Sequence, residues 1–302
     1  MSVEPMQQAT LPSTGGGDTA ITGVSPRMRV RAETLSHAGR VRSNNEDHFL
    51  VATLAKSLYV QQTSLCKTDP LRFSREEGYL MVVADGMGGA VAGERASALA
   101  IESVETFVLE SLKWFMHQRT GAEENSLIRE LREGLSGADR AVTDAAEADR
   151  NLEGMGTTLT MVYAVGDEMA ILHAGDSRAY LFRAGALEQL TRDHTVVQEM
   201  VEEGLISAED ARTHRKRHVI TNVVGGPSRG VEAEVRTLKL RVGDRILLCS
   251  DGLNEPLRDF EIAAILQAEP EIGPACKRLI DAALDGGAPD NVTVIVARVD
   301  AA

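Results

Sequence analysis

The sequence has few aromatic residues and few cysteines. Aromatic residues make up 4% of the 302 positions, and the three cysteines are Cys66, Cys249 and Cys276. Because this number is odd and no two cysteines are close in sequence, the spacing argues against a disulfide framework and a zinc ribbon and favours buried or incidental thiols. Apolar residues still make up 43% of the chain, so we expect a sizeable core built mainly from aliphatic side chains.

The sequence also lacks a long apolar run and an excess of positive charge. No stretch approaches the ~20 apolar residues of a membrane-spanning helix, and the N-terminus has no pattern typical of a signal peptide. The formal net charge of −13 argues against nucleic-acid binding, which depends on cationic side chains. We therefore expect a cytoplasmic protein with neither a membrane nor a nucleic-acid partner.

Patterning predicts a flexible tail over residues 1–27 and a single domain over residues 28–302. Strands are predicted at 28–35, 48–54, 79–84, 157–165, 169–174, 178–183, 187–190, 233–240, 245–249 and 291–299, and helices from Gly89 to Phe115 and at 126–147, 195–218, 258–268 and 271–284. The first two strands are expected to pair as a hairpin, and residues 55–78 to form an irregular surface excursion. This order lacks the strict βαβ alternation of a doubly wound sheet. It favours an α+β fold of two mostly antiparallel sheets, stacked face to face, with helices on both outer faces.

Acidic residues stand at the ends of several predicted strands, next to Gly or Asn. These segments are Asn44-Asn45-Glu46-Asp47, Asp85-Gly86-Met87-Gly88-Gly89, Gly175-Asp176-Ser177-Arg178, Ser250-Asp251-Gly252 and Pro289-Asp290-Asn291. Any one of them alone is ordinary turn chemistry. Buried strands that end together would bring the acids together, and clustered carboxylates persist where cations neutralise them. All-oxygen ligation favours Mg²⁺ or Mn²⁺, and Gly86 and Gly252 would let backbone or water approach such an ion.

The ordered set of motifs resembles the bacterial form of the type 2C metal-dependent protein phosphatases. The matching segments are Arg42 to Asp47, Val83 to Gly89, Gly156-Thr157-Thr158, His173 to Arg178, Thr191 to His194, Ser250-Asp251-Gly252 and Asp290-Asn291. The resemblance covers about residues 30–299. It implies a sandwich of two sheets flanked by helices, and a phosphatase acting on phosphoserine and phosphothreonine in proteins. It further implies a monomer that opposes a Ser/Thr protein kinase.

The resemblance also implies a role for each site residue. Asp85 would bridge two Mn²⁺ or Mg²⁺ ions, and the Gly86 carbonyl would bind one of them. Asp251 and Asp290 would complete the first ion's protein ligands, while Glu46 and Asp47 would hold waters on the second. Asp176 would help to bind a weaker third ion. Arg42 would grip the substrate phosphate, and a water shared by the two ions would attack phosphorus.

One position departs from many eukaryotic members of the family. These have a histidine after the second-motif Asp-Gly pair, proposed as the general acid, whereas this sequence has Met87. Leaving-group protonation would then fall to a metal-bound water or to another residue. His48 and His173 lie near motifs, and we interpret both as structural.

Three other readings compete with an enzyme of this kind. Cys66 to Arg72 fits the C-x₅-R spacing of a cysteine phosphatase, but Pro70 removes a backbone N–H and Asp69 would repel phosphate. A non-catalytic, phosphatase-like module that binds phosphoproteins would have lost its metal acids, and these are present. A simple cation-binding protein would not place Arg42 beside them.

A basic run is the last feature that bears on function. The segment at 195–226 corresponds to a variable flap beside the active site in this family, and within it Arg212, His214, Arg215, Lys216, Arg217 and His218 are close together. The run is either a solvated helix face or a docking surface for the phosphorylated segment of a substrate.

Overall fold

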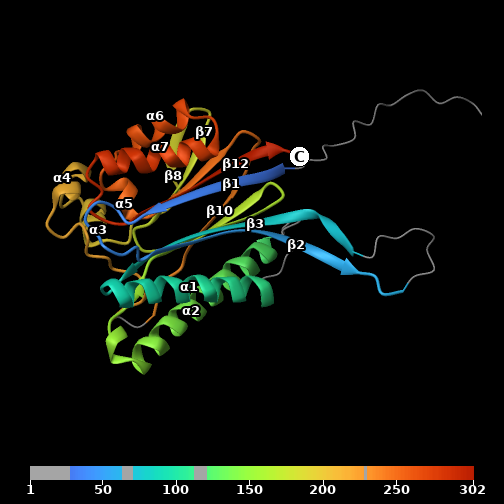
Figure 1. Cartoon of the computed structure of the whole chain (residues 1–302), viewed down its shortest axis with the longest axis horizontal. Helices are drawn as coiled ribbons and strands as arrows, with labels where there is room; N and C mark the ends of the chain where they lie inside the picture. The colour runs from blue at the N-terminus through green and yellow to red at the C-terminus, as the bar shows by residue number, and fades with distance from the viewer. Residues whose placement is uncertain (1–27, 63–70, 112–120, 228–229) are drawn as a thin grey trace, which may run out of the picture.

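Two antiparallel sheets pack face to face and helices cover both outer faces, as Figure 1 shows. The architecture was obtained from a computed structural model, which describes residues 28–62, 71–111, 121–227 and 230–302. The four layers and the antiparallel pairing confirm the predicted α+β sandwich.

The first sheet has five strands in the order β1-β12-β11-β7-β8. They are β1 (Met28–His37), β7 (Arg178–Arg183), β8 (Ala186–Gln189), β11 (Arg245–Cys249) and β12 (Val292–Ala301). The second sheet has seven strands in the order β10-β6-β5-β3-β4-β9, with β2 also paired to β3. They are β2 (Asp47–Tyr59), β3 (Leu71–Met87), β4 (Gly156–Thr157), β5 (Leu159–Val165), β6 (Glu168–Ala174), β9 (Val224–Gly225) and β10 (Glu234–Lys239).

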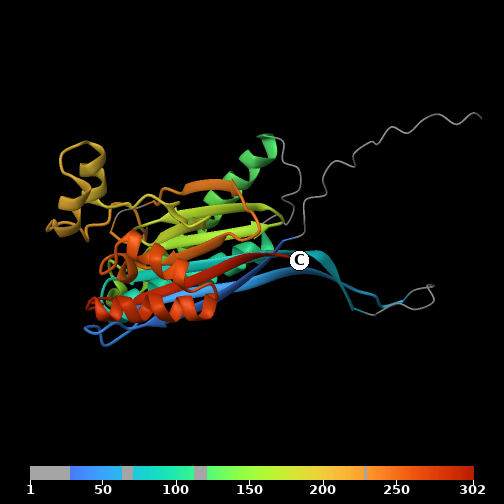
Figure 2. The ribbon, with the colours of Figure 1, turned by 90° about the horizontal axis from the view of Figure 1, so that it is seen from above.

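Helices cover both sheets. The helical elements are α1 (Ala90–Glu110), α2 (Gly121–Ala148), the 3₁₀ turn η1 (Arg150–Leu152), α3 (Val196–Glu202), α4 (Ala208–Thr213), α5 (Asp251–Asn254), α6 (Asp259–Ala268) and α7 (Ile272–Asp285). The first two lie on the seven-stranded sheet and the last three on the five-stranded sheet, whereas α3 and α4 project from the body (Figure 2). Among the described residues, no helix has the length and apolar character needed to cross a bilayer.

Strand β12 shows why some strands read as unbroken apolar runs. Successive side chains point to opposite faces of a sheet. Ile295 and Ala297 therefore pack between the two sheets, while Val294 and Val296 pack against α6 and α7. Because both faces of β12 are covered, apolar residues occupy successive positions along the strand and do not alternate with polar ones.

The first predicted hairpin is wrong. Strand β1 pairs with β12, with Leu35 opposite Val294, whereas β2 pairs with β3 in the other sheet. The apolar β12 offers β1 a buried partner, and that pairing gives more contact than a local turn would. The predicted excursion at 55–78 is also wrong in part. Strand β2 continues to Tyr59 and β3 begins at Leu71, so a two-stranded ribbon extends beyond the body (Figure 1).

The predicted helix at 195–218 is two short helices. A turn after Glu202 separates them, and Ser207 then caps α4. The Ser207 hydroxyl accepts a hydrogen bond from the Asp210 N–H at 3.1 Å, and the Asp210 carboxylate accepts from the Ser207 N–H. This capping box was readable as S-x-x-D in the sequence. Leu112 and Phe115, which the sequence placed on the first long helix, lie outside the described residues, as does the segment Cys66 to Pro70.

Candidate active site

The ends of several strands bring the predicted acids to one place. Asp85 lies near the end of β3, Asp176 lies between β6 and β7, and Asp251 begins α5 directly after β11. Asp290 precedes β12 by two residues. Together they line a cavity of about 490 Å³, and the other predicted site residues on its wall are Arg42, Glu46 and Gly86.

Asp47 is buried and is not among the residues that line this cavity. It stands opposite Asp85 in the pairing of β2 with β3. Its Oδ2 accepts hydrogen bonds from the Ser250 and Thr293 hydroxyls, both at 2.7 Å. Burial raises the pKa of Asp47 to about 6, although the two hydroxyls lower it. Ser250 and Thr293 were not predicted as site residues. The only signal for Ser250 was a hydroxyl beside Asp251, and Thr293 lies three residues after Asp290.

Asp47 and Asp176 are buried, Asp85 and Asp251 are half-buried, and the four acids oppose one another's ionisation. Burial, and then the charges of Asp47, Asp251 and Asp176, hold the pKa of Asp85 well above its usual range. Burial and Asp176 do the same for Asp251, and burial followed by Asp193 raises the pKa of Asp176 to about 7. Among the described residues, Oδ1 of Asp47 and Oδ1 of Asp251 are buried with no hydrogen-bond partner. Buried carboxylate oxygens that lack donors fit divalent cations, which prefer such ligands.

The Gly156-Thr157-Thr158 motif fixes the backbone of Asp85. The Asp85 N–H donates to Thr158 Oγ1 at 2.9 Å, and Thr157 Oγ1 donates to the Asp85 carbonyl at 2.8 Å. The Thr158 N–H also donates to that carbonyl. The two threonines thus hold both backbone polar groups of the central acid.

Asn291 has a similar function for the loop that carries Glu46. Its Nδ2 donates to the carbonyls of Ala38 and Asn44, at 3.0 and 2.8 Å, and its Oδ1 accepts from the Glu46 N–H at 2.8 Å. The sequence showed Asn291 as a motif residue but gave no hint of this contact, because the partners lie about 250 positions away.

The motif glycines are needed for close backbone packing. A Cβ on Gly86 would lie 2.1 Å from the Gly93 carbonyl oxygen, and one on Gly252 would lie 1.9 Å from that of Asn291. Gly93, inside α1, was not predicted, and a Cβ there would lie 2.0 Å from Glu46 Oε2. A glycine inside a helix costs about 1 kcal/mol, so its presence was a readable signal.

Arg42 contacts one of the acids directly. Its Nη2 lies 2.6 Å from Asp290 Oδ2, and both side chains are partly exposed on the cavity wall. This hydrogen bond raises the pKa of Arg42. Burial raises the pKa of the neighbouring Glu46, against the lowering effect of Arg42.

The basic run is divided in the structure. Arg212 donates to the Glu255 carbonyl at 3.0 Å, and His218 Nδ1 lies 2.9 Å from Glu255 Oε1. Arg217 and His218 also line the cavity. Arg215 and Lys216 are exposed. The run is therefore not one continuous helix face.

A family model matches most of the chain. The model described as Protein phosphatase 2C matches residues 60–282. The chain belongs to the protein phosphatase 2C family. The motif order, the sandwich and the convergence of strand-end acids are all accounted for by this membership.

Relatives in the 2C family cover nearly the whole domain. The chain is 38% identical over 270 residues to the serine/threonine protein phosphatase PstP of Mycobacterium tuberculosis, covering 89% of this chain but 45% of that protein. It is 30% identical to the serine/threonine phosphatase stp of Listeria monocytogenes, covering 90% of this chain and 96% of the relative. A crystal structure of the catalytic domain of PstP in complex with two manganese ions matches with a TM-score of 0.71 and 36% identity, covering 90% of this chain and 99% of that one.

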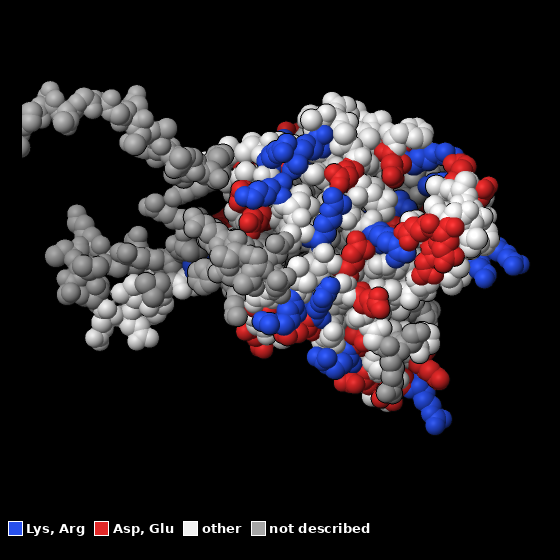
Figure 3. Space-filling view, turned by 180° about the vertical axis from the view of Figure 1, so that it is seen from behind, with Lys and Arg blue, Asp and Glu red and all other residues white. Residues whose placement is uncertain are grey.

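The surface of this 2C domain carries charges of both signs. On the face shown in Figure 3, Lys and Arg side chains alternate with Asp and Glu, and no broad basic area is visible.

Proposed function

We propose that this chain is a protein phosphatase that hydrolyses phosphoserine and phosphothreonine in proteins with two Mn²⁺ or Mg²⁺ ions. The observation that carries the proposal is the convergence of Asp85, Asp251 and Asp290 on one cavity beside Arg42. The wider form of the proposal places the enzyme in the cytoplasm as a monomer that reverses a Ser/Thr kinase. It is supported by the family resemblance of residues 28–302, the proposed catalytic domain.

The proposed ligand roles follow the family pattern. Asp85 and the Gly86 carbonyl, with Asp251 and Asp290, would hold one ion, and Asp85 would be shared with the second. Glu46 would serve the second ion. Asp47 is also suited to serve the second ion. Two hydroxyls donate to its Oδ2, whereas its Oδ1 has no donor.

Asp176 would serve a weaker third ion. Its carboxyl group lines the same cavity, and its raised pKa reflects burial beside Asp193. When bound, the cations supply positive charge that lowers the pKa of an attacking water and offsets charge on the phosphoryl group. Arg42 would bind the phosphate oxygens through its planar set of donors.

The two cysteines among the described residues, Cys249 and Cys276, do not support a thiol mechanism. Burial raises the pKa of Cys249 to about 12 and that of Cys276 to about 11, so both thiols are protonated at neutral pH. Met87 has no proton to donate, so the proton for the leaving group must come from elsewhere. We therefore infer that Cys249, Cys276 and Met87 do not attack phosphorus. The site side chains would instead bind and orient the substrate and the cations.

An assay tests this function directly. Hydrolysis of p-nitrophenyl phosphate and of a phosphothreonine peptide should require Mn²⁺ and stop when a chelator is added. Binding of the peptide without hydrolysis, by folded protein that binds Mn²⁺, would instead support the non-catalytic regulator. Binding of Mn²⁺ without any interaction with the peptide would support a simple cation-binding protein.

A further inference from the structure

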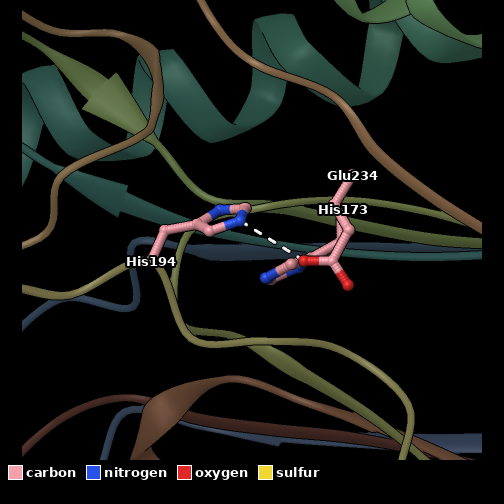
Figure 4. Close-up of side chains that lie close together, drawn as sticks. All are labelled: His173, His194 and Glu234. Carbon is pink, nitrogen blue, oxygen red and sulfur yellow. Dashed lines mark ion pairs between the residues drawn. The ribbon is translucent and has the colours of Figure 1, made fainter. Parts of the chain in front are cut away.

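A second group of polar side chains, two buried histidines and a half-buried glutamate, lies beside the first. His173 is on β6, His194 follows β8 at the start of the flap segment, and Glu234 begins β10 opposite His173. Figure 4 shows the three side chains turned toward one another. The two imidazole rings stack with centroids 4.8 Å apart, and His194 Nε2 lies 3.4 Å from Glu234 Oε2.

Hydrogen bonds fix the proton positions on His194. Its Nδ1 lies 3.1 Å from the Gly175 N and 3.0 Å from Asn222 Nδ2. The Asn222 amide cannot be reversed, because its Oδ1 accepts from the Glu232 N–H and its Nδ2 donates to the Glu232 carbonyl. A backbone N–H can only donate, so Nδ1 of His194 is an acceptor and the ring proton is on Nε2.

The same reasoning applies to His173. Its Nε2 lies 3.0 Å from the Arg192 carbonyl, which can only accept, so Nε2 carries the proton. Nδ1 then accepts from Thr160 Oγ1 at 2.9 Å. Burial lowers the pKa of His173 to about 4, which agrees with a neutral ring.

These proton positions argue against a metal site at the three residues. The three could offer ligand atoms within 4.8 Å of one another. A cation near Glu234 would need a free lone pair on His194 Nε2. The proton would have to move to Nδ1, where the Gly175 N–H already points. The cluster therefore has another purpose.

His194 connects the turn that carries Asp176 to both ends of the flap segment. Besides accepting from the Gly175 N–H, it donates its own N–H to the Gly175 carbonyl at 2.7 Å. Its carbonyl accepts from the Thr221 N–H at 2.8 Å. Gly175 has a φ of +115°, and a Cβ there would lie 2.6 Å from Thr158, so the turn has little freedom of its own.

We propose that His194 is a positioning residue: its Nδ1 holds the Gly175 N–H and thereby fixes the carboxylate of Asp176 relative to the flap. The part of this inference that concerns cation binding rests on the proposed function. The part that concerns the hydrogen bond does not.

Two substitutions separate the acceptor from the shape of the side chain. In His194→Asn, Oδ1 takes a place equivalent to Nδ1 and can accept from Gly175. His194→Leu has nearly the shape of asparagine and no acceptor. A buried N–H that loses its partner is costly, so in the leucine variant hydrogen exchange of the Gly175 amide should accelerate by about tenfold or more. In the asparagine variant it should stay within about threefold of wild type.

Calorimetric titration with Mn²⁺ gives the second readout. The affinity for the weaker Mn²⁺ ion, the one proposed at Asp176, should fall about tenfold in His194→Leu and change little in His194→Asn. Equal behaviour of the two variants, in either direction, would overturn the proposal, because only the acceptor distinguishes them.

Ring ¹⁵N NMR of the wild-type chain keeps the proposal testable if His194→Leu fails to fold. A ring that carries its proton on Nδ1 would overturn it. If the wild type hydrolyses no phosphopeptide while the Gly175 amide is protected as expected, the proposed function fails and the positioning inference stands.

Discussion

Two buried polar clusters lie a few residues apart in this protein, and they differ in how their polar atoms are satisfied. In the histidine cluster, each ring nitrogen of His173 and His194 has a protein partner. In the acid cluster, Oδ1 of Asp47 and Oδ1 of Asp251 have no hydrogen-bond partner among the described residues. A completed network stabilises one conformation, whereas an incomplete one stores electrostatic energy that a ligand can release. The difference is consistent with a positioning role for the histidine cluster and a cation-binding role for the acid cluster.

The largest test of this contrast is the removal of one charge from the acid cluster. Asp251→Asn should lower turnover by roughly 10²- to 10³-fold, because the cations provide several kcal/mol of charge stabilisation. Steady-state kinetics with Mn²⁺ measures the change. Asp281→Asn, an exposed acid on α7 that pairs with Lys277, is the control and should behave as wild type. Activity within a few-fold of wild type in Asp251→Asn would remove that acid from the site.

A cation should stabilise the acid cluster in particular. Binding to the folded state alone adds about 2.7 kcal/mol at a hundredfold excess over Kd, which raises the melting temperature by roughly 5–10 °C for a domain of this size. Thermal unfolding with and without Mn²⁺ measures the shift, and Asp85→Asn should abolish most of it. A shift that survives this substitution would place the binding elsewhere.

The two clusters should respond to pH with opposite signs. In metal-free protein, Asp47 and Asp176 have pKa values of about 6 and 7, above the ordinary 3.8. The folded state then binds more protons than the unfolded state, so the unfolding free energy falls as pH rises through this window. His173, with a pKa of about 4 instead of 6.5, gives the reverse: its contribution is lost as pH falls from 6.5 to 4.

Denaturant unfolding in the presence of a chelator, as a function of pH, measures these slopes. Asp176→Asn should reduce the loss of stability toward pH 7, and His173→Gln should reduce the loss toward pH 4. If both variants changed the unfolding free energy on the same side of the pH profile, the predicted opposite pH responses of the two clusters would be wrong.

Arg42 is expected to affect substrate and not the cations. Arg42→Ala should raise KM by about tenfold, because charge-assisted contacts to phosphate are lost. Mn²⁺ affinity should not decline. Arg40→Ala is a matched control, since that side chain bonds the Leu284 carbonyl away from the cavity wall. Loss of Mn²⁺ binding in Arg42→Ala would assign Arg42 to the metal centre instead.

The smallest effect is expected on the flap surface. Arg217 and His218 face Glu255, whereas Arg215 and Lys216 are exposed. Changing Arg215 and Lys216 together to Ala should slow phosphopeptide hydrolysis about two- to threefold at low salt, and the effect should fade as salt screens the charges.

Turnover of p-nitrophenyl phosphate should not change in this double variant. The paired substitution of Lys277 and Arg278 removes the same charge from α7, outside the flap segment, and serves as the control. Equal effects on both substrates would make the exposed basic pair an ordinary part of the surface.

Local signals in the sequence predicted the acids of the cluster better than the residues that hydrogen-bond to them. Each acidic segment contains Gly or Asn and lies at the edge of a predicted strand, so its place at a strand end was readable. The supports depend on contacts across the chain: Thr293 reaches Asp47 from 246 positions away. The pairing of β1 with β12 was missed for the same reason, because nothing near residue 28 indicates a partner at the other end of the domain. The break between α3 and α4 was local, and the Ser207 cap could have revealed it.

The ion pair between Arg42 and Asp290 would couple the two proposed kinds of ligand. If a cation at Asp290 and a phosphate at Arg42 each displace the same 2.6 Å contact, whichever binds first would remove that obstacle for the other. By thermodynamic reciprocity, the factor by which Mn²⁺ improves phosphate affinity must equal the factor by which phosphate improves Mn²⁺ affinity. Inorganic phosphate, a product of the proposed reaction, would then retain the cations as it accumulates.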